Sequence, residues 1–146
     1  MLSELGDGQH EHYFVEFGAT DGVLLSNTHL LETRLGWNGI LAEPARVWQD
    51  RLKQNRTCCI DFKCVASEDA GQLEFVEPGS PEHSGIVKYA DNGEVHSCGR
   101  MYSQNVDMVD TVSLDNLLGD YGSPLQISCL SMDTEGSELA ILESLD

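Results

Sequence analysis

The sequence predicts an α/β fold with a doubly wound, mostly parallel sheet, and two observations point to it. Short apolar runs typical of buried strands alternate with segments of helical periodicity. Three of these runs carry an acid at or near their ends, namely Glu16, Glu43 and Asp133. Because the carboxyl ends of parallel strands meet at one edge of a sheet, we expect these acids to converge on one crevice.

The composition indicates one globular domain with a strongly acidic surface. The 146 residues include 25 Asp and Glu against 8 Lys and Arg, a formal net charge of -17. Such a surface repels phosphate backbones and anionic membrane surfaces, so we expect neither nucleic acid nor a membrane as a partner. No apolar run reaches the ~18 residues that a membrane span requires.

The cysteines favour a cytoplasmic protein without a metal centre. They are odd in number and include no Cys-x-x-Cys pair, so neither a disulfide framework nor zinc is expected. We expect reduced, mostly buried thiols at Cys58, Cys59, Cys64, Cys98 and Cys129. The pair His10 and His12 lies in a polar leader, residues 1–12, where solvated histidines are more common than metal ligands.

A strand and a glycine turn open the fold. Residues 13–17 are aromatic and β-branched around one acid, which predicts a buried strand. Gly18 and Gly22 follow, and glycines in such a turn let the backbone approach a ligand because no Cβ blocks it. A helix is expected next, with capping residues at 26–28 and a stop signal at Gly36.

The second unit repeats this order. Residues 39–43 predict a second strand, and residues 45–55 predict a helix with Trp48 and Leu52 on one side. Glu43 follows Gly18 by 25 residues, where an acid on the second strand of a nucleotide-binding fold contacts the ribose hydroxyls. A carboxylate can accept both hydroxyl hydrogens at once. The alternative is a surface acid at a strand end.

The rest of the chain predicts more elements around one long variable segment. That segment, 77–108, is too long for a simple connection and is interpreted as a functional loop or lid. The other expected elements are strands at 58–66, 72–76 and 126–133, an alternating run at 109–114, and helices at 114–118 and from 134 onward.

Three motifs together resemble the FkbM family of methyltransferases over residues 13–146. They are Glu16-Phe17-Gly18-Ala19-Thr20-Asp21-Gly22 with Leu25-Ser26-Asn27-Thr28, Leu35-Gly36-Trp37-Asn38-Gly39 with Glu43-Pro44, and Asp133-Thr134-Glu135-Gly136-Ser137-Glu138. Ser131 departs from the pattern, because many members carry lysine there.

The resemblance implies a Rossmann-like sheet of the class I methyltransferase type and S-adenosylmethionine as methyl donor. The expected acceptor is a hydroxyl on a sugar or secondary metabolite. By position, Glu16, Gly18 and Gly22 would line the methionine part of the cofactor, and Glu43 its ribose. The cofactor-binding set also includes Ala19, Asp21 and Asn27, with Val65 and Ala66 near the adenine.

Methyl transfer to a hydroxyl needs aligned reactants and removal of a proton. By resemblance, Asp133 and Glu135 would face the transferring methyl group, so Asp133 is the first candidate base and Glu135 the second. The alternative for both is a role as a helix cap, because an acid at a helix N-terminus is stabilising without catalysis.

Two further hypotheses stay open at this point. A dinucleotide-binding oxidoreductase is disfavoured because Gly18 and Gly22 have a Gly-x-x-x-Gly spacing rather than Gly-x-Gly-x-x-Gly. A non-catalytic module that keeps the fold is the other. A class I methyltransferase sheet has seven strands and the sequence predicts four parallel ones, so we expect a domain incomplete at its C-terminus.

Overall fold

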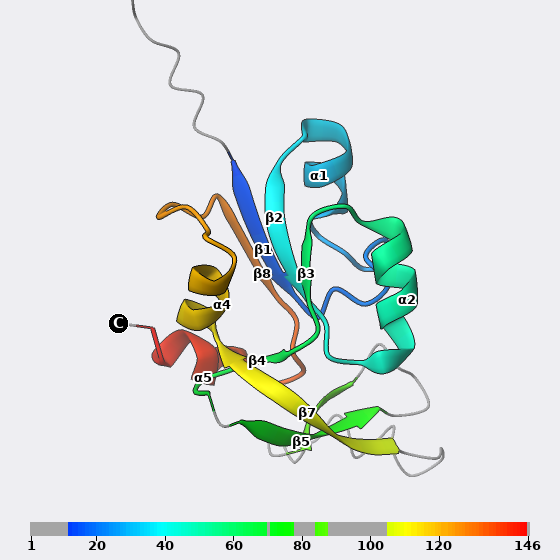
Figure 1. Cartoon of the computed structure of the whole chain (residues 1–146), viewed down its shortest axis with the longest axis vertical. Helices are drawn as coiled ribbons and strands as arrows, with labels where there is room; N and C mark the ends of the chain where they lie inside the picture. The colour runs from blue at the N-terminus through cyan, green and yellow to red at the C-terminus, as the bar shows by residue number, and fades with distance from the viewer. Residues whose placement is uncertain (1–11, 70, 78–83, 88–104, 146) are drawn as a thin grey trace, which may run out of the picture.

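The computed structural model describes residues 12–69, 71–77, 84–87 and 105–145, and these form two sheets with helices packed around them (Figure 1). The strands are β1 (Tyr13–Phe17), β2 (Asn38–Ala42), β3 (Cys59–Asp61), β4 (Cys64–Ala66), β5 (Gln72–Glu77), β6 (Gly85–Ile86), β7 (Asn105–Ser113) and β8 (Cys129–Met132). The helices are α1 (His29–Leu35), α2 (Arg46–Asn55), α4 (Leu114–Asp120) and α5 (Glu138–Glu143).

The first sheet is parallel, with the strand order β3-β2-β1-β8. β1 is central, and its Val15 is in register with Ile40 of β2 on one side and Leu130 of β8 on the other. The predicted strands at 13–17, 39–43 and 126–133 thus lie side by side, and their parallel arrangement is confirmed. The carboxyl ends of β1, β2 and β8 therefore meet at one edge.

Helices cover both faces of this sheet because β1 is apolar on both (Figure 1). Val15 and Phe17 pack in one cluster with Leu117 of α4, whereas Phe14 packs in another with Leu52 of α2. Successive side chains of a strand point to opposite faces of the sheet, which separates Val15 and Phe17 from Phe14. Each fully buried apolar side chain contributes roughly 1.5–3 kcal/mol to the free energy of folding. The sheet is thereby fixed between two layers.

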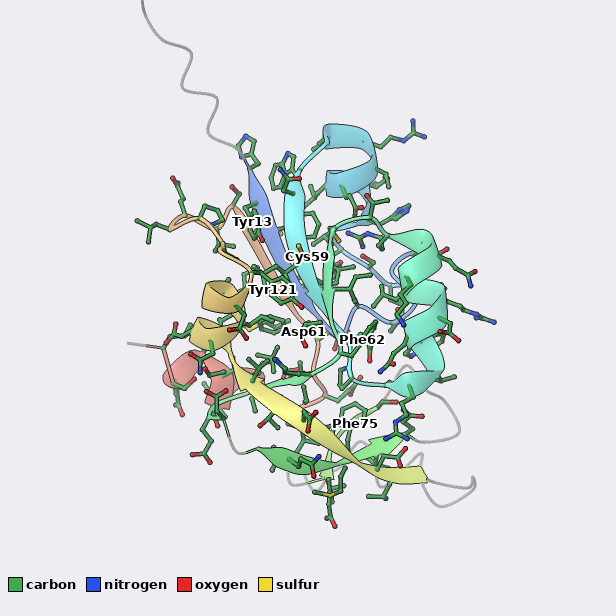
Figure 2. All side chains as sticks on the ribbon, viewed as in Figure 1. Tyr13, Cys59, Asp61, Phe62, Phe75 and Tyr121 are labelled. Atoms are coloured by element: carbon green, nitrogen blue, oxygen red, sulfur yellow. The ribbon has the colours of Figure 1, made fainter. Side chains whose placement is uncertain are left out.

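The prediction of one strand at 58–66 is wrong. β3 pairs with β2 in the first sheet, and β4 pairs with β7 in the second. Between them Asp61 Oδ1 accepts the backbone N–H of Lys63 at 2.7 Å, which turns the chain. The hydroxyl of Tyr121, just after α4, donates to Asp61 Oδ2 at 3.1 Å and lies beside it in Figure 2.

The second sheet has the order β4-β7-β5-β6 and is mixed. β5 runs antiparallel to both β7 and β6, whereas β4 is parallel to β7. The predicted loop 77–108 therefore has strands at its borders, since Glu77 ends β5 and Asn105 begins β7. Its segments 78–83 and 88–104 lie outside the described residues, as do residues 1–11 of the predicted leader.

The thiols are less buried than predicted. Cys64 is buried and Cys58 and Cys129 are half-buried, but Cys59 is exposed, so the prediction is wrong for that residue. Burial raises the pKa of Cys64 to about 12, and the negative charge of Glu43 adds to the rise. Cys98 lies outside the described residues. No helix within the described ranges is long and apolar enough to cross a membrane.

Candidate functional site

A cavity opens where the carboxyl ends of β1, β2 and β8 face the second sheet. About 550 Å³ of unfilled space lies there, including its open mouth. The residues lining it are Phe17, Gly18, Thr20, Leu25, Glu43, Pro44, Cys64, Val65, Phe75, Ser84, Ile86, Asp133 and Thr134. Of the residues predicted for the site, it brings together Gly18, Glu43, Val65 and Asp133. Its position, at the carboxyl ends of parallel strands, is typical of a ligand site in an α/β protein.

Gly18 and Asp133 bring the first and third motifs into contact. Gly18 has φ +71°, and a Cβ built on it would lie 2.0 Å from the backbone oxygen of Asp133. The backbone N–H of Asp133 donates to the carbonyl of Phe17 at 3.2 Å. Only glycine fits this approach, because any side chain would push the two loops apart.

Glu43 supplies a buried carboxylate to the cavity wall. Its Oε2 accepts the backbone N–H of Thr20 at 2.8 Å, and its Oε1 accepts that of Ala45 at 2.9 Å. Burial raises the pKa of Glu43 to about 7, and the Glu77 carboxylate adds to the rise, although the two hydrogen bonds oppose it. Each oxygen keeps a lone pair for a ligand hydroxyl.

The loop after β8 carries the two predicted catalytic acids. Asp133 is exposed at the cavity, and Glu135 is half-buried with φ +56° but does not line the cavity. Helix α5 begins at Glu138 with Ser137 as its N-cap, so neither acid occupies the cap position. Their catalytic roles stay predictions.

Glu138 holds this loop in place. Its Oε1 accepts the backbone N–H of Thr134 at 2.6 Å, and its Oε2 accepts that of Gly136 at 3.0 Å. Burial alone would raise the pKa of Glu138, but hydrogen bonds from its own backbone N–H and from those of Thr134 and Gly136 keep the pKa below its ordinary value. The last acid of the third motif therefore acts on the backbone beside Asp133.

Apolar side chains from the second sheet form the opposite wall. Val65 of β4, Phe75 of β5 and Ile86 of β6 are all buried and line the cavity, and Phe75 is labelled in Figure 2. Leu25 stands at the mouth, 65% exposed and with φ +64°. Sequence reasoning missed Phe75, Ile86 and Leu25, since apolar residues in strands and turns indicate no ligand by themselves.

Glu16 lies outside the cavity lining although it was predicted to contact the cofactor. It is 2% exposed, and its carboxylate accepts the Ser26 hydroxyl at 2.8 Å, the Asn27 backbone N–H at 2.7 Å and the Thr28 hydroxyl at 2.6 Å. The carboxylate of Glu16 thus holds the segment 26–28, which follows the glycine turn. Its contact with a cofactor stays a prediction.

The other predicted cofactor residues also lie beside the cavity rather than in its wall. Asp21 accepts the backbone N–H groups of Val23 and Leu24, and Asn27 donates from Nδ2 to Ser131 Oγ at 2.9 Å. Ser131, the departure from the family pattern, therefore has a polar partner here. Ala19, Gly22 and Ala66 are buried in the surrounding framework.

Comparison with known proteins identifies one family. A family model described as the methyltransferase FkbM domain matches residues 16–146. No curated protein and no solved structure matches the chain. Over the described ranges, no group of three or more His, Cys, Asp or Glu side chains could hold a metal ion.

Proposed function

The chain belongs to the FkbM methyltransferase family, and from this premise we propose that it transfers a methyl group from S-adenosylmethionine to a hydroxyl of a small molecule. The expected acceptor class is a sugar or secondary metabolite. We also propose that the first sheet is part of a doubly wound, Rossmann-like sheet of the class I type. The parallel order β3-β2-β1-β8, with helices on both faces, supports that topology.

The contact between the motifs carries the proposal. Gly18 of the first motif touches the backbone of Asp133 of the third, and Glu43 of the second lines the same cavity. These residues are far apart in the sequence, and the fold brings them to one edge of the sheet. A shared cavity is what a common ligand requires.

The cavity residues fit S-adenosylmethionine. Glu43 is buried, keeps free lone pairs and can accept the two ribose hydroxyls, while Val65 and Phe75 offer an apolar surface to the adenine. Gly18 and Thr20 present the loop backbone to the methionine part. When bound, this cofactor supplies an electrophilic methyl group on a sulfonium.

The chain's own contribution is alignment and proton removal. Rigid loops that fix both reactants can lower a barrier by several kcal/mol, about 7–11 in the best intramolecular cases. Asp133 is exposed at the cavity, where its carboxylate can accept the proton of an acceptor hydroxyl. We propose Asp133 as the base, with Glu135 as the second candidate.

Calorimetric titration tests cofactor binding. We expect the wild-type chain to bind S-adenosylhomocysteine, and Glu43→Ala to weaken binding by roughly 10–100-fold, because about 1.4–2.8 kcal/mol of hydrogen bonding to the ribose is lost. The exposed Glu74→Ala of β5 is the charge-matched control and should bind like wild type. Titration with NAD tests the oxidoreductase alternative. Heat with NAD, and none with either S-adenosyl compound, would overturn the proposal.

The role of Asp133 needs a separate test. With labelled S-adenosylmethionine and a panel of sugars and phenols, Asp133→Asn should lower methyl transfer by about 10²–10⁴-fold. Its affinity for S-adenosylhomocysteine should stay unchanged. Turnover that persists in this variant would assign the base elsewhere, and Glu135→Gln then tests the second candidate. Binding without turnover in the wild type would favour the non-catalytic module.

A further inference from the structure

A buried arginine contacts the loop formed by residues 22–28 and does not line the cavity. Arg56 is the C-cap residue of α2, and its side chain is fully buried. Burying a guanidinium is costly unless its donors are satisfied, so its contacts show what it holds. No motif in the sequence pointed to this residue.

The guanidinium of Arg56 donates to three points of the loop. Nη1 reaches the backbone carbonyl of Gly22 at 3.0 Å and the hydroxyl of Ser26 at 2.9 Å. Nη2 reaches the hydroxyl of Thr28 at 3.0 Å. These points span seven residues of chain, so one side chain fixes the path of the whole segment.

Arg56 and Glu16 share the same two hydroxyls. Ser26 and Thr28 accept from Arg56 and donate to Glu16 Oε2, and Arg56 Nη1 lies 3.9 Å from that oxygen. Each hydroxyl therefore sits between a cation and an anion, an arrangement in which charge-assisted hydrogen bonds are strong. The two charges neutralise each other in a region where neither is solvated.

The remaining side of Arg56 is attached to the helical layer. Its Nε donates to Glu32 of α1, and Glu32 in turn accepts the backbone N–H of Thr57 at 2.8 Å. The guanidinium carbon also lies 5.5 Å from the centre of the Phe14 ring of β1. The loop is thus tied through Arg56 to α1 and to the central strand.

We propose that Arg56 is a positioning residue that sets the cofactor affinity of the cavity without touching the cofactor. The segment it holds includes Leu25, which lines the cavity, and begins just after Gly18 and Thr20, which also line it. This inference rests on the proposed function. Lysine cannot replace arginine here, because a single ammonium cannot span the three separated acceptors as the planar fork does.

Two measurements on Arg56→Lys test the inference. Hydrogen exchange of residues 20–28 should become faster, and affinity for S-adenosylhomocysteine in the folded fraction should fall by about tenfold or more. Tyr121→Phe is the control for a purely structural loss, because it removes only the hydroxyl that bonds Asp61 and the Ile60 carbonyl, and Tyr121 does not line the cavity. It should lower the melting temperature yet leave loop exchange and affinity within about twofold of wild type.

A milder variant covers the case in which Arg56→Lys does not fold. Thr28→Val removes the shared hydroxyl at nearly constant volume and should change exchange and affinity in the same direction. Thr33→Val on the exposed side of α1 is its matched control. Wild-type exchange and affinity in both Arg56→Lys and Thr28→Val would overturn the inference.

The two readouts separate this inference from the proposed function. If the wild-type chain binds no S-adenosylhomocysteine, the proposed function is overturned, and with it the link from Arg56 to affinity. Faster exchange of residues 20–28 in Arg56→Lys, but not in Tyr121→Phe, would still support the positioning of the loop. Normal affinity combined with faster exchange in Arg56→Lys would overturn only the link from Arg56 to cofactor affinity.

Discussion

Single carboxylates shape the loops of this site. Glu16, Glu43 and Glu138, one from each motif, all accept backbone N–H groups of the segments around the cavity. An acid in such a place satisfies amide groups that would otherwise be buried without partners. The motif acids therefore have a structural role in addition to the chemistry predicted for them.

Gly18 gives the sharpest prediction at the scale of one residue. Gly18 and Gly36 both have positive φ, +71° and +69°, but a Cβ on Gly36 would meet nothing within 4 Å. Gly36→Ala therefore measures the backbone cost alone, about 1 kcal/mol. Gly18→Ala should lose a further ~1–3 kcal/mol of unfolding free energy, because its Cβ would overlap the Asp133 carbonyl. Equal losses in urea denaturation would contradict this close contact.

Glu43 predicts a pH dependence of stability. Burial raises the pKa of Glu43 to about 7 from 4.5, so the folded chain holds this proton more tightly than the unfolded chain. Its contribution to stability is complete below about pH 4.5 and is lost as the pH rises to about 7. The difference in unfolding free energy between wild type and Glu43→Gln should therefore fall over this window, by about 3 kcal/mol. A flat difference in urea denaturation from pH 4.5 to 7.5 would contradict the raised pKa.

At the scale of elements, Glu32 joins α1 to the turn between α2 and β3. Its Oε1 accepts the backbone N–H groups of Thr57 at 2.8 Å and Cys58 at 3.1 Å, and its Oε2 accepts from Arg56. Burial alone would raise the pKa of Glu32, but hydrogen bonds from the Thr57 hydroxyl, from Arg56 and from the Thr57 backbone N–H lower it to about 2. One side chain thus connects α1 with the C-terminal end of α2 and with the turn that leads into β3.

Removing this charge should loosen the whole layer. We expect Glu32→Gln to lower the unfolding free energy by about 1–3 kcal/mol at pH 7, because charged hydrogen bonds are lost and Arg56 stays buried. Since the pKa of Glu32 is lowered, the loss should shrink as the pH falls from about 4.5 through about 2. Glu74→Gln, at an exposed position of β5, should change stability by no more than about 0.5 kcal/mol. Similar losses in the two variants would refute this role.

The limits of prediction also appear at the scale of elements. Strands β1, β2 and β8 of the first sheet were predictable because each is a short apolar run with a turn signal after it. The division of the predicted strand 58–66 into β3 and β4 was not, although two charged residues, Asp61 and Lys63, interrupt its apolar run. Both halves carry strand residues, and only the partners β2 and β7 decide which sheet each half joins.

The candidate site, too, was predictable from the sequence only in part. Gly18, Glu43 and Asp133 were predictable because glycine turns and strand-end acids have local patterns, and all three line the cavity. Arg56 was not, because its hydrogen-bond partners lie 24 to 34 residues away and a lone arginine after a helix has no local signature. Tertiary contacts, rather than local patterns, determine which charges are buried.

For the molecule as a whole, charge is the dominant feature. Acidic residues outnumber basic ones by 25 to 8, so at least 17 acids have no basic counterpart anywhere in the chain. Several of the cations are already paired, since Arg56 contacts Glu32 and Lys63 lies 3.7 Å from Asp120. Repulsion among the remaining carboxylates opposes the compact state.

Salt should therefore stabilise the fold. At about 10 mM salt the Debye length is about 30 Å, and at 150 mM it is about 8 Å, so added salt screens most of this repulsion. We expect the melting temperature to rise by about 3–5 °C over that range, which corresponds to about 1 kcal/mol for a domain of this size. NaCl and KCl should act equally, because screening depends on ionic strength, whereas a bound ion would discriminate between them. A melting temperature that falls with salt would mean that exposed pairs such as Lys63 with Asp120 outweigh the repulsion.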